Sequence, residues 1–148
     1  ALVAAALQEA GQQGCGFVLA TAKSPAYLLR LKPGIMDGPL AAHLPPALAK
    51  LDVMALNFLI FEQVLHLSQA EQDDEEIFHY ASTVPEALKA LEDGQVQLAF
   101  LLNPTRIDQV QEVASAGLIM PRKSTFFYPK VPVGLVLHPI DPEEDIEF

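Results

Sequence analysis

Apolar and polar residues alternate in strand-like runs in some parts of this chain and recur at helical spacing in others. The first strand-like runs predict a β-hairpin. Residues 17–21 and 26–31 are short runs rich in valine, leucine and aromatic side chains, with the turn Ala22-Lys23-Ser24-Pro25 between them. Such runs on either side of a short turn are typical of paired antiparallel strands. The preceding apolar stretch 2–10 predicts a helix that ends at Gly11, because glycine adopts a left-handed C-cap conformation at little cost.

The middle of the chain predicts one largely buried helix. Residues 32–46 are dense in proline and glycine, which break regular structure, so we expect a loop there. Apolar residues then recur at helical spacing from 53 to 65, and Asp52 is a candidate N-cap. Phe58 and Phe61 widen the apolar stripe, so this helix should have little polar face.

Strands and helices alternate in the rest of the chain. Residues 77–81 predict a strand, and the capping box from Thr83 to Glu86 starts a helix that ends at Gly94. Residues 96–102 predict an interior strand, residues 105–117 a helix and residues 133–138 a final strand. We therefore predict one domain over residues 1–148 with an α+β fold: a mixed β-sheet with helices packed on it, in which an N-terminal hairpin precedes helix-linked strands.

Composition narrows the classes of function. The formal net charge of −10 disfavours binding to nucleic acid or anionic lipid, because both need a basic surface. The apolar runs fall short of the roughly 18 residues of a membrane helix, so we expect a soluble protein, and the single cysteine favours a reducing, cytoplasmic setting. The single cysteine, Cys15, excludes an internal disulfide, and no cysteine or histidine pair stands at metal-ligand spacing. The acidic clusters 71–76 and 141–147 are expected to be solvated.

Residues 120–130 concentrate positive charge in this acidic chain. The segment contains no acid, and the side chains that could surround a phosphate or carboxylate are Arg122, Lys123, Ser124, Thr125, Tyr128 and Lys130. A P-loop is excluded, because Arg122 stands where that motif needs glycine and a helix rather than a strand precedes the segment. One alternative stays open: the aromatic residues pack in the core while the lysines extend into water.

The same segment resembles the signature of the domain-of-unknown-function 1015 family. In that family Met-Pro-Pro-Lys-Ser-Thr is followed by aromatic residues, Pro-Lys and Ser-Gly-Leu, and here Met120 to Leu135 follows this order. The order of elements is also similar from Leu51 to Gly117. Three positions differ, since Arg122 replaces a proline, Val133 a serine and Asn57 a histidine of the buried helix.

The resemblance implies that the chain is the C-terminal part of a longer protein. The N-terminal part of the family carries an Asp-Gly-His-His-Arg-type motif, similar to the nucleotide-binding segment of the ParB, sulfiredoxin and free-serine-kinase group. That motif is absent from this chain. Most catalytic residues are then expected elsewhere, and the chain alone is not expected to turn over a substrate.

Two hypotheses about function follow. The first is the C-terminal domain of a nucleotide- or phosphate-metabolite-binding protein, kinase-like enzymes included, in which residues 120–130 contact an anion. The second is an interaction or dimerisation module with no catalytic role, because helix 53–67 and the hairpin could pack against another surface. The expected partners are the N-terminal part of the same protein, a small phosphorylated ligand or a second copy of the chain. No pattern in the sequence identifies a reaction or a cofactor.

Overall fold

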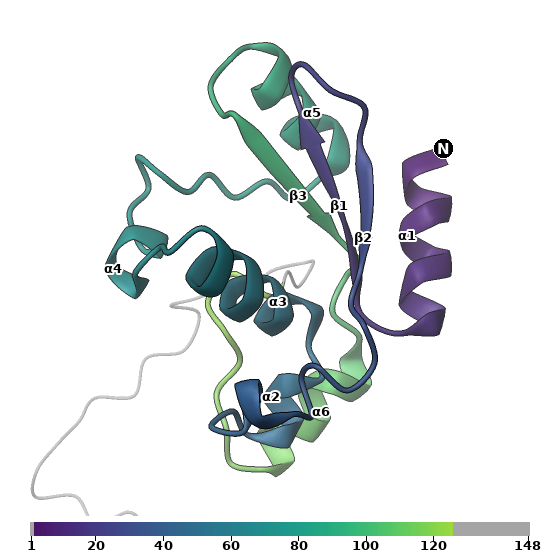
Figure 1. The fold of residues 1–148 in the computed structure, drawn as a ribbon, viewed down its shortest axis with the longest axis vertical. Coiled ribbons are helices and arrows are strands. Elements are labelled where there is room, and N and C mark those ends of the chain that lie inside the picture. The colour runs from purple at the N-terminus through teal and green to yellow at the C-terminus, as the bar shows by residue number, and fades with distance from the viewer. Residues whose placement is uncertain (1, 126–148) are drawn as a thin grey trace, which may run out of the picture.

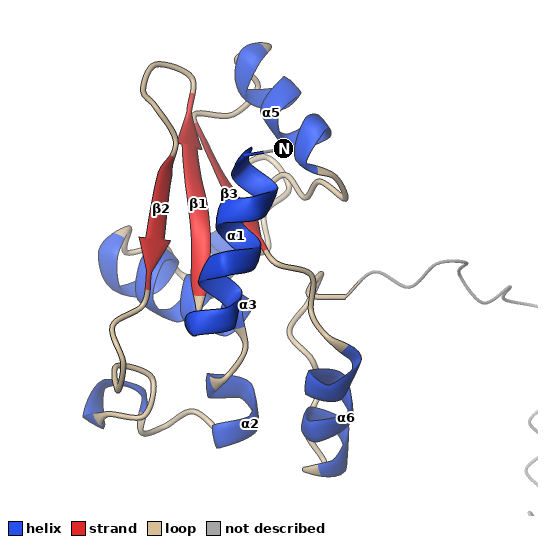
Figure 2. Ribbon diagram, turned by 90° about the vertical axis from the view of Figure 1, so that its right-hand side faces the viewer, coloured by secondary structure: helices blue, strands red, loops and turns tan. Residues whose placement is uncertain are grey.

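The computed structural model describes residues 2–125 and centres on a three-stranded sheet. The strands are β1 (Gly16–Thr21), β2 (Tyr27–Arg30) and β3 (Leu98–Leu102), in the order β2-β1-β3 (Figure 2). Both pairings are antiparallel, with Val18 opposite Leu28 on one side and Leu101 on the other. The predicted hairpin and the α+β class are confirmed, and the sheet is antiparallel throughout the described residues.

Helices cover the two faces of the sheet because side chains alternate along β1. One face carries Val18 and Ala20, which pack against α1 (Leu2–Gln13) and α5 (Val84–Glu92). The opposite face carries Phe17, which packs against the helical segment formed by α3 (Asp52–Ala55) and η2 (Leu56–Val64). Figure 1 shows the three layers, with α1 on one side of the strands and α3 on the other.

Helix α1 does not end at Gly11, as the sequence predicts, but continues to Gln13. The glycine is needed for space instead, since a Cβ atom at Gly11 would lie 2.7 Å from Nδ2 of Asn103. That amide donates a hydrogen bond of 2.8 Å to the backbone oxygen of Leu7. The helix ends before Gly14, whose φ of 138° is strained for any other residue.

The predicted helix 53–65 is present, but it changes type along its length. After α3, the η2 segment is a π-helix, as the 2.9 Å hydrogen bond from Leu65 N to Ile60 O illustrates. Its last turn is not buried, because Val64 is 63% exposed. Asp52 is the first helical residue rather than the N-cap, and Leu51 holds that position without a side-chain hydrogen bond.

Two strand predictions are wrong. Residues 77–81 form turns and irregular backbone, because no strand of the described chain pairs with them, and Ile77 and Tyr80 are exposed. The strand predicted at 96–102 begins at Leu98, and among the described strands it lies at an edge rather than in the interior, because β1 takes the central position. The strand predicted at 133–138 lies outside the described residues.

In the second half of the chain the helix predicted from Thr83 to Gly94 is confirmed, whereas the helix predicted at 105–117 spans only Ile107–Ser115. The Thr83 side chain caps α5 by accepting a hydrogen bond from Glu86 N, and Gly94 follows the helix with a φ of 72°. Helix α6 (Ile107–Ser115) is followed by Gly117, which also has a positive φ. Local capping chemistry determines these ends, which is why the sequence predicts them.

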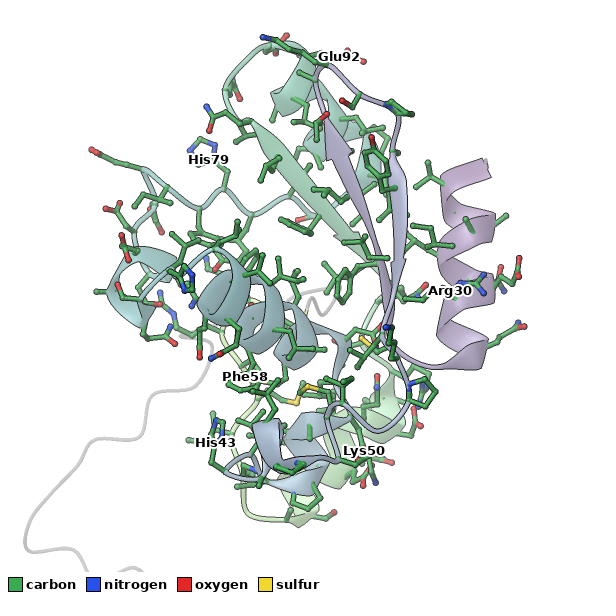
Figure 3. The ribbon with its side chains drawn as sticks, in the orientation of Figure 1. Arg30, His43, Lys50, Phe58, His79 and Glu92 are labelled. Atoms are coloured by element: carbon green, nitrogen blue, oxygen red, sulfur yellow. The ribbon has the colours of Figure 1, made fainter. Side chains whose placement is uncertain are left out.

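Short helices below the sheet complete the described fold. The loop at 32–46 contains the 3₁₀ helix η1 (Pro39–Ala41) and leads into α2 (Pro46–Ala49), while α4 (Gln69–Gln72) precedes the irregular segment. His43 from this loop meets Phe58 edge to face, with 5.0 Å between ring centroids (Figure 3). No helix among the described residues is long and apolar enough to cross a membrane.

Candidate functional site

A turn at the end of the described chain fixes the backbone of the candidate anion site. Ser124 N donates to Pro121 O at 3.3 Å, and Ser124 Oγ donates to the same oxygen at 2.6 Å. Thr105, just before α6, donates from Oγ1 to Ser124 O at 2.7 Å. The turn is therefore anchored to the start of α6.

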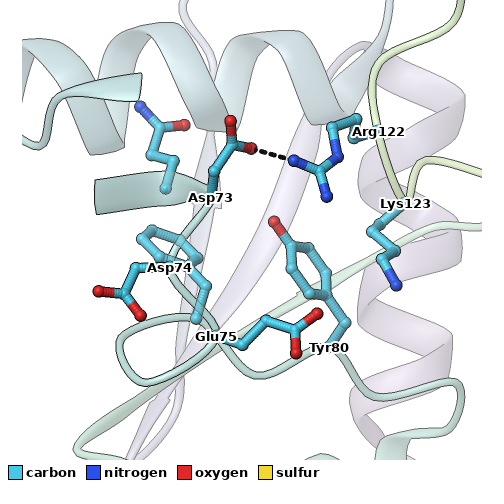
Figure 4. Close-up of a pocket in the computed structure, with 8 residues that line it drawn as sticks. Asp73, Asp74, Glu75, Tyr80, Arg122 and Lys123 are labelled. Carbon is cyan, nitrogen blue, oxygen red and sulfur yellow. Dashed lines mark hydrogen bonds and ion pairs between the residues drawn. The ribbon is translucent and has the colours of Figure 1, made fainter. Parts of the chain in front are cut away.

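Lys123 has an unusual position in this turn. Its φ is 57°, in the left-handed region that favours glycine and is uncommon for a long side chain. Its Nζ atom lies 5.9 Å from the centre of the Tyr80 ring (Figure 4). Among the described residues no carboxylate forms an ion pair with Lys123, so its charge is held beside an aromatic ring instead.

Arg122 points to a different neighbour from Lys123. Its Nη1 atom lies 2.7 Å from Oδ1 of Asp73, which comes from the acidic cluster at 71–76 (Figure 4). Both side chains remain largely exposed, so the pair stabilises the fold by less than about 1 kcal/mol. Partial burial raises the pKa of the Tyr80 hydroxyl beside them, and the Arg122 charge opposes that shift. The acidic cluster thus neutralises one member of the predicted anion set.

An open groove adjoins the turn. Strand β3 with the residues after it and the segment 76–84 line it, together with parts of α1, α3, α5 and α6. Its polar lining includes Asp52, Asn57, Asn103, Thr105, Arg106, Lys123, Ser124 and Thr125. Charged and hydroxyl side chains line other parts of the groove as well, among them Glu76, Ser82 and Glu86.

The six predicted anion-site residues have different surroundings in the structure. Lys123 and Thr125 line the groove, and no described residue forms a hydrogen bond or ion pair with either of them. The Ser124 hydroxyl is used within the turn, and Arg122 is paired with Asp73. Tyr128 and Lys130 lie outside the described residues.

Sequence reasoning missed two neighbours of the turn, Tyr80 and Thr105. Tyr80 is in a run with the composition of a strand, so its exposed ring was not expected. Thr105 was assigned only to the start of a helix. The hydrogen bond from the Thr105 hydroxyl to Ser124 has no sequence signature, because the partner is 19 positions away.

The side chains of Cys15 and Asp52 form a hydrogen-bonded pair, and both residues line the groove. Burial raises the pKa of the Cys15 thiol, and the Asp52 charge raises it further, so the thiol stays protonated and is a poor nucleophile. Burial also raises the pKa of Asp52, against the Cys15 hydrogen bond and the Arg106 charge. Within residues 2–125 no group of histidine, cysteine and acidic side chains could hold a metal ion.

Asp52→Asn should remove part of the pH dependence of stability. The folded state binds the Asp52 proton more tightly than the unfolded chain does, so this group makes stability fall as pH rises from its ordinary pKa of 3.8 through the raised folded value. Urea unfolding of wild type and variant from pH 3 upward measures the difference. The variant should gain stability relative to wild type across that window. A difference that is constant with pH would contradict the assignment.

No family model, curated protein or solved structure matches this chain. The resemblance to the domain-of-unknown-function 1015 family therefore stays a prediction from residues 51–135.

Proposed function

We propose that the chain is the C-terminal domain of a protein that binds a nucleotide or phosphorylated metabolite, and that Lys123 contacts the phosphate. The position of Lys123 carries the proposal. A left-handed conformation costs a residue with a side chain roughly 1–2 kcal/mol, and a glycine would avoid that cost. Strain of this kind is concentrated at binding sites, where a side chain is needed at a particular point.

The surroundings of Lys123 support an anionic ligand on the groove side. Its ammonium group has no carboxylate partner among the described residues, although the neighbouring Arg122 is paired with Asp73. Thr125 lines the same groove and has a hydroxyl that no described residue engages. Charge-assisted hydrogen bonds from such groups are the interactions that hold phosphate in proteins.

A second candidate function is an interaction module. On the sheet face that packs against Phe61, the far end is left uncovered, since Tyr27 is 49% and Leu98 43% exposed. Exposed apolar side chains on one face of a sheet are typical of surfaces that meet another segment or chain. This candidate needs no ligand at Lys123.

Thermal-shift measurements on the purified 148-residue chain test the first candidate. Inorganic phosphate, nucleotides and phosphorylated sugars are the probes, and a ligand at a hundredfold its Kd should add about 2.7 kcal/mol of stability. Lys123→Ala should weaken binding by about 1.5–3 kcal/mol, the range for a hydrogen bond to a charged group. Lys23→Ala, in the exposed hairpin turn, is the control. The proposal fails if no phosphate compound stabilises the protein, or if the two alanine variants bind alike.

A further inference from the structure

The outer edge of strand β3 is unpaired in the described part of the protein. β3 pairs with β1 on one side only. Apart from the ladder with β1, no backbone hydrogen bond joins residues 98–102 to another described segment. Edge strands that present unpaired donors and acceptors are usually covered or paired, because they otherwise recruit other strands. We therefore expect another segment to cover or pair with this edge.

The groove described above runs along that edge. Every residue of β3 lines it, including those that point to opposite faces of the sheet, as expected for a groove beside the strand rather than above it. Exposed apolar side chains line it, with Leu98 43% exposed and Ile77 and Tyr80 50% and 55% exposed. Residues 77–81 have the composition of a strand, yet they pair with no described strand.

We propose that residues 133–138 of this same chain fill the groove as a further strand paired with β3. Thr125, the last described residue, lines the groove, so the chain leaves the described structure beside this edge. Seven residues separate Thr125 from Val133 and can span roughly 23–25 Å when extended. A five-residue strand such as β3 is only about 17 Å long, so the segment can reach either end of it.

The sequence of the segment fits that position. Val133, Leu135 and Leu137 alternate with Gly134, Val136 and His138, so apolar side chains occur on both faces, as in a strand covered on both sides. Pro132 precedes the segment, at a position where a strand tolerates proline. The proposal does not rest on phosphate binding, because it uses no contact of Lys123.

NMR amide exchange on the full 148-residue chain tests the proposal without a ligand. The β3 amides that do not bond to β1 should exchange at least about 100-fold more slowly than in an unstructured peptide, since a net hydrogen bond in a stable sheet protects its donor. Nuclear Overhauser contacts should link residues 133–138 to β3 in the wild-type protein. Absence of both, or contacts and protection that vanish on dilution and so require a second copy, would overturn the proposal.

Proline substitutions identify the segment responsible. Neighbouring amides of a strand point to opposite edges, so one of Leu135→Pro and Val136→Pro removes a donor that faces β3. At least one of them should cost the outer β3 amides about tenfold or more of their protection while β1 amides keep theirs. Glu144→Pro, outside the segment, is the control and should match wild type. Equal protection in all four proteins would also overturn the proposal.

Discussion

Phe61→Ala should lower the free energy of unfolding by about 3–5 kcal/mol, the range for removing a large aromatic side chain from a core. Phe61 is only 9% exposed. Its ring meets two others edge to face, with centroid distances of 4.9 Å to Phe78 and 5.4 Å to Phe100. The ring therefore joins helix η2 to the sheet and to the segment that carries Tyr80. The loss is a large part of the roughly 5–15 kcal/mol that holds a typical domain folded.

Urea unfolding followed by circular dichroism measures the loss. Val64→Ala is the matched control, because Val64 lies on the same helix and is 63% exposed. That change should stay within about 0.5 kcal/mol of wild type. Equal losses in the two variants would show that the η2 packing described here does not support the fold.

Lys123→Gly should weaken phosphate binding without lowering the stability of the fold. Glycine accepts the φ of 57° at that position without strain, so stability should hold or rise by up to about 1 kcal/mol, once the larger entropy of an unfolded glycine is subtracted. The same change removes the ammonium group, so phosphate binding should weaken by about 1.5–3 kcal/mol, or roughly 10- to 150-fold in Kd. Chemical unfolding and a ligand titration on one preparation give both numbers.

Two outcomes would contradict this expectation. A glycine variant that binds phosphate compounds like wild type would remove Lys123 from the site. A glycine variant that is less stable by more than about 1 kcal/mol would show that the ammonium group above Tyr80 supports the fold, which a cation–π contact of that size can do. Lys123→Arg, which retains the charge and the strain, is the control and should keep most of the affinity.

The candidate site shows the limits of prediction from residues alone. The sequence identified Lys123, Ser124 and Thr125 as one polar segment, because unusual composition is visible without a fold. It could not assign Asp73 to Arg122 or Tyr80 to Lys123, since those partners lie more than 40 positions away. Which cation is neutralised and which is left beside an aromatic ring depends on how the acidic segment packs.

For the fold, too, the sequence predicts local features, whereas contacts between distant segments are decided by the tertiary structure. The hairpin, the Thr83 cap and the left-handed Gly94 and Gly117 are predicted from the sequence, because each depends on neighbours within a few residues. The tertiary structure alone decided that β1 lies between β2 and β3 among the described strands, because strand order is set by packing between distant segments. It also placed the Asn103 amide against Gly11 inside helix α1, where a Cβ atom would lie 2.7 Å from Nδ2.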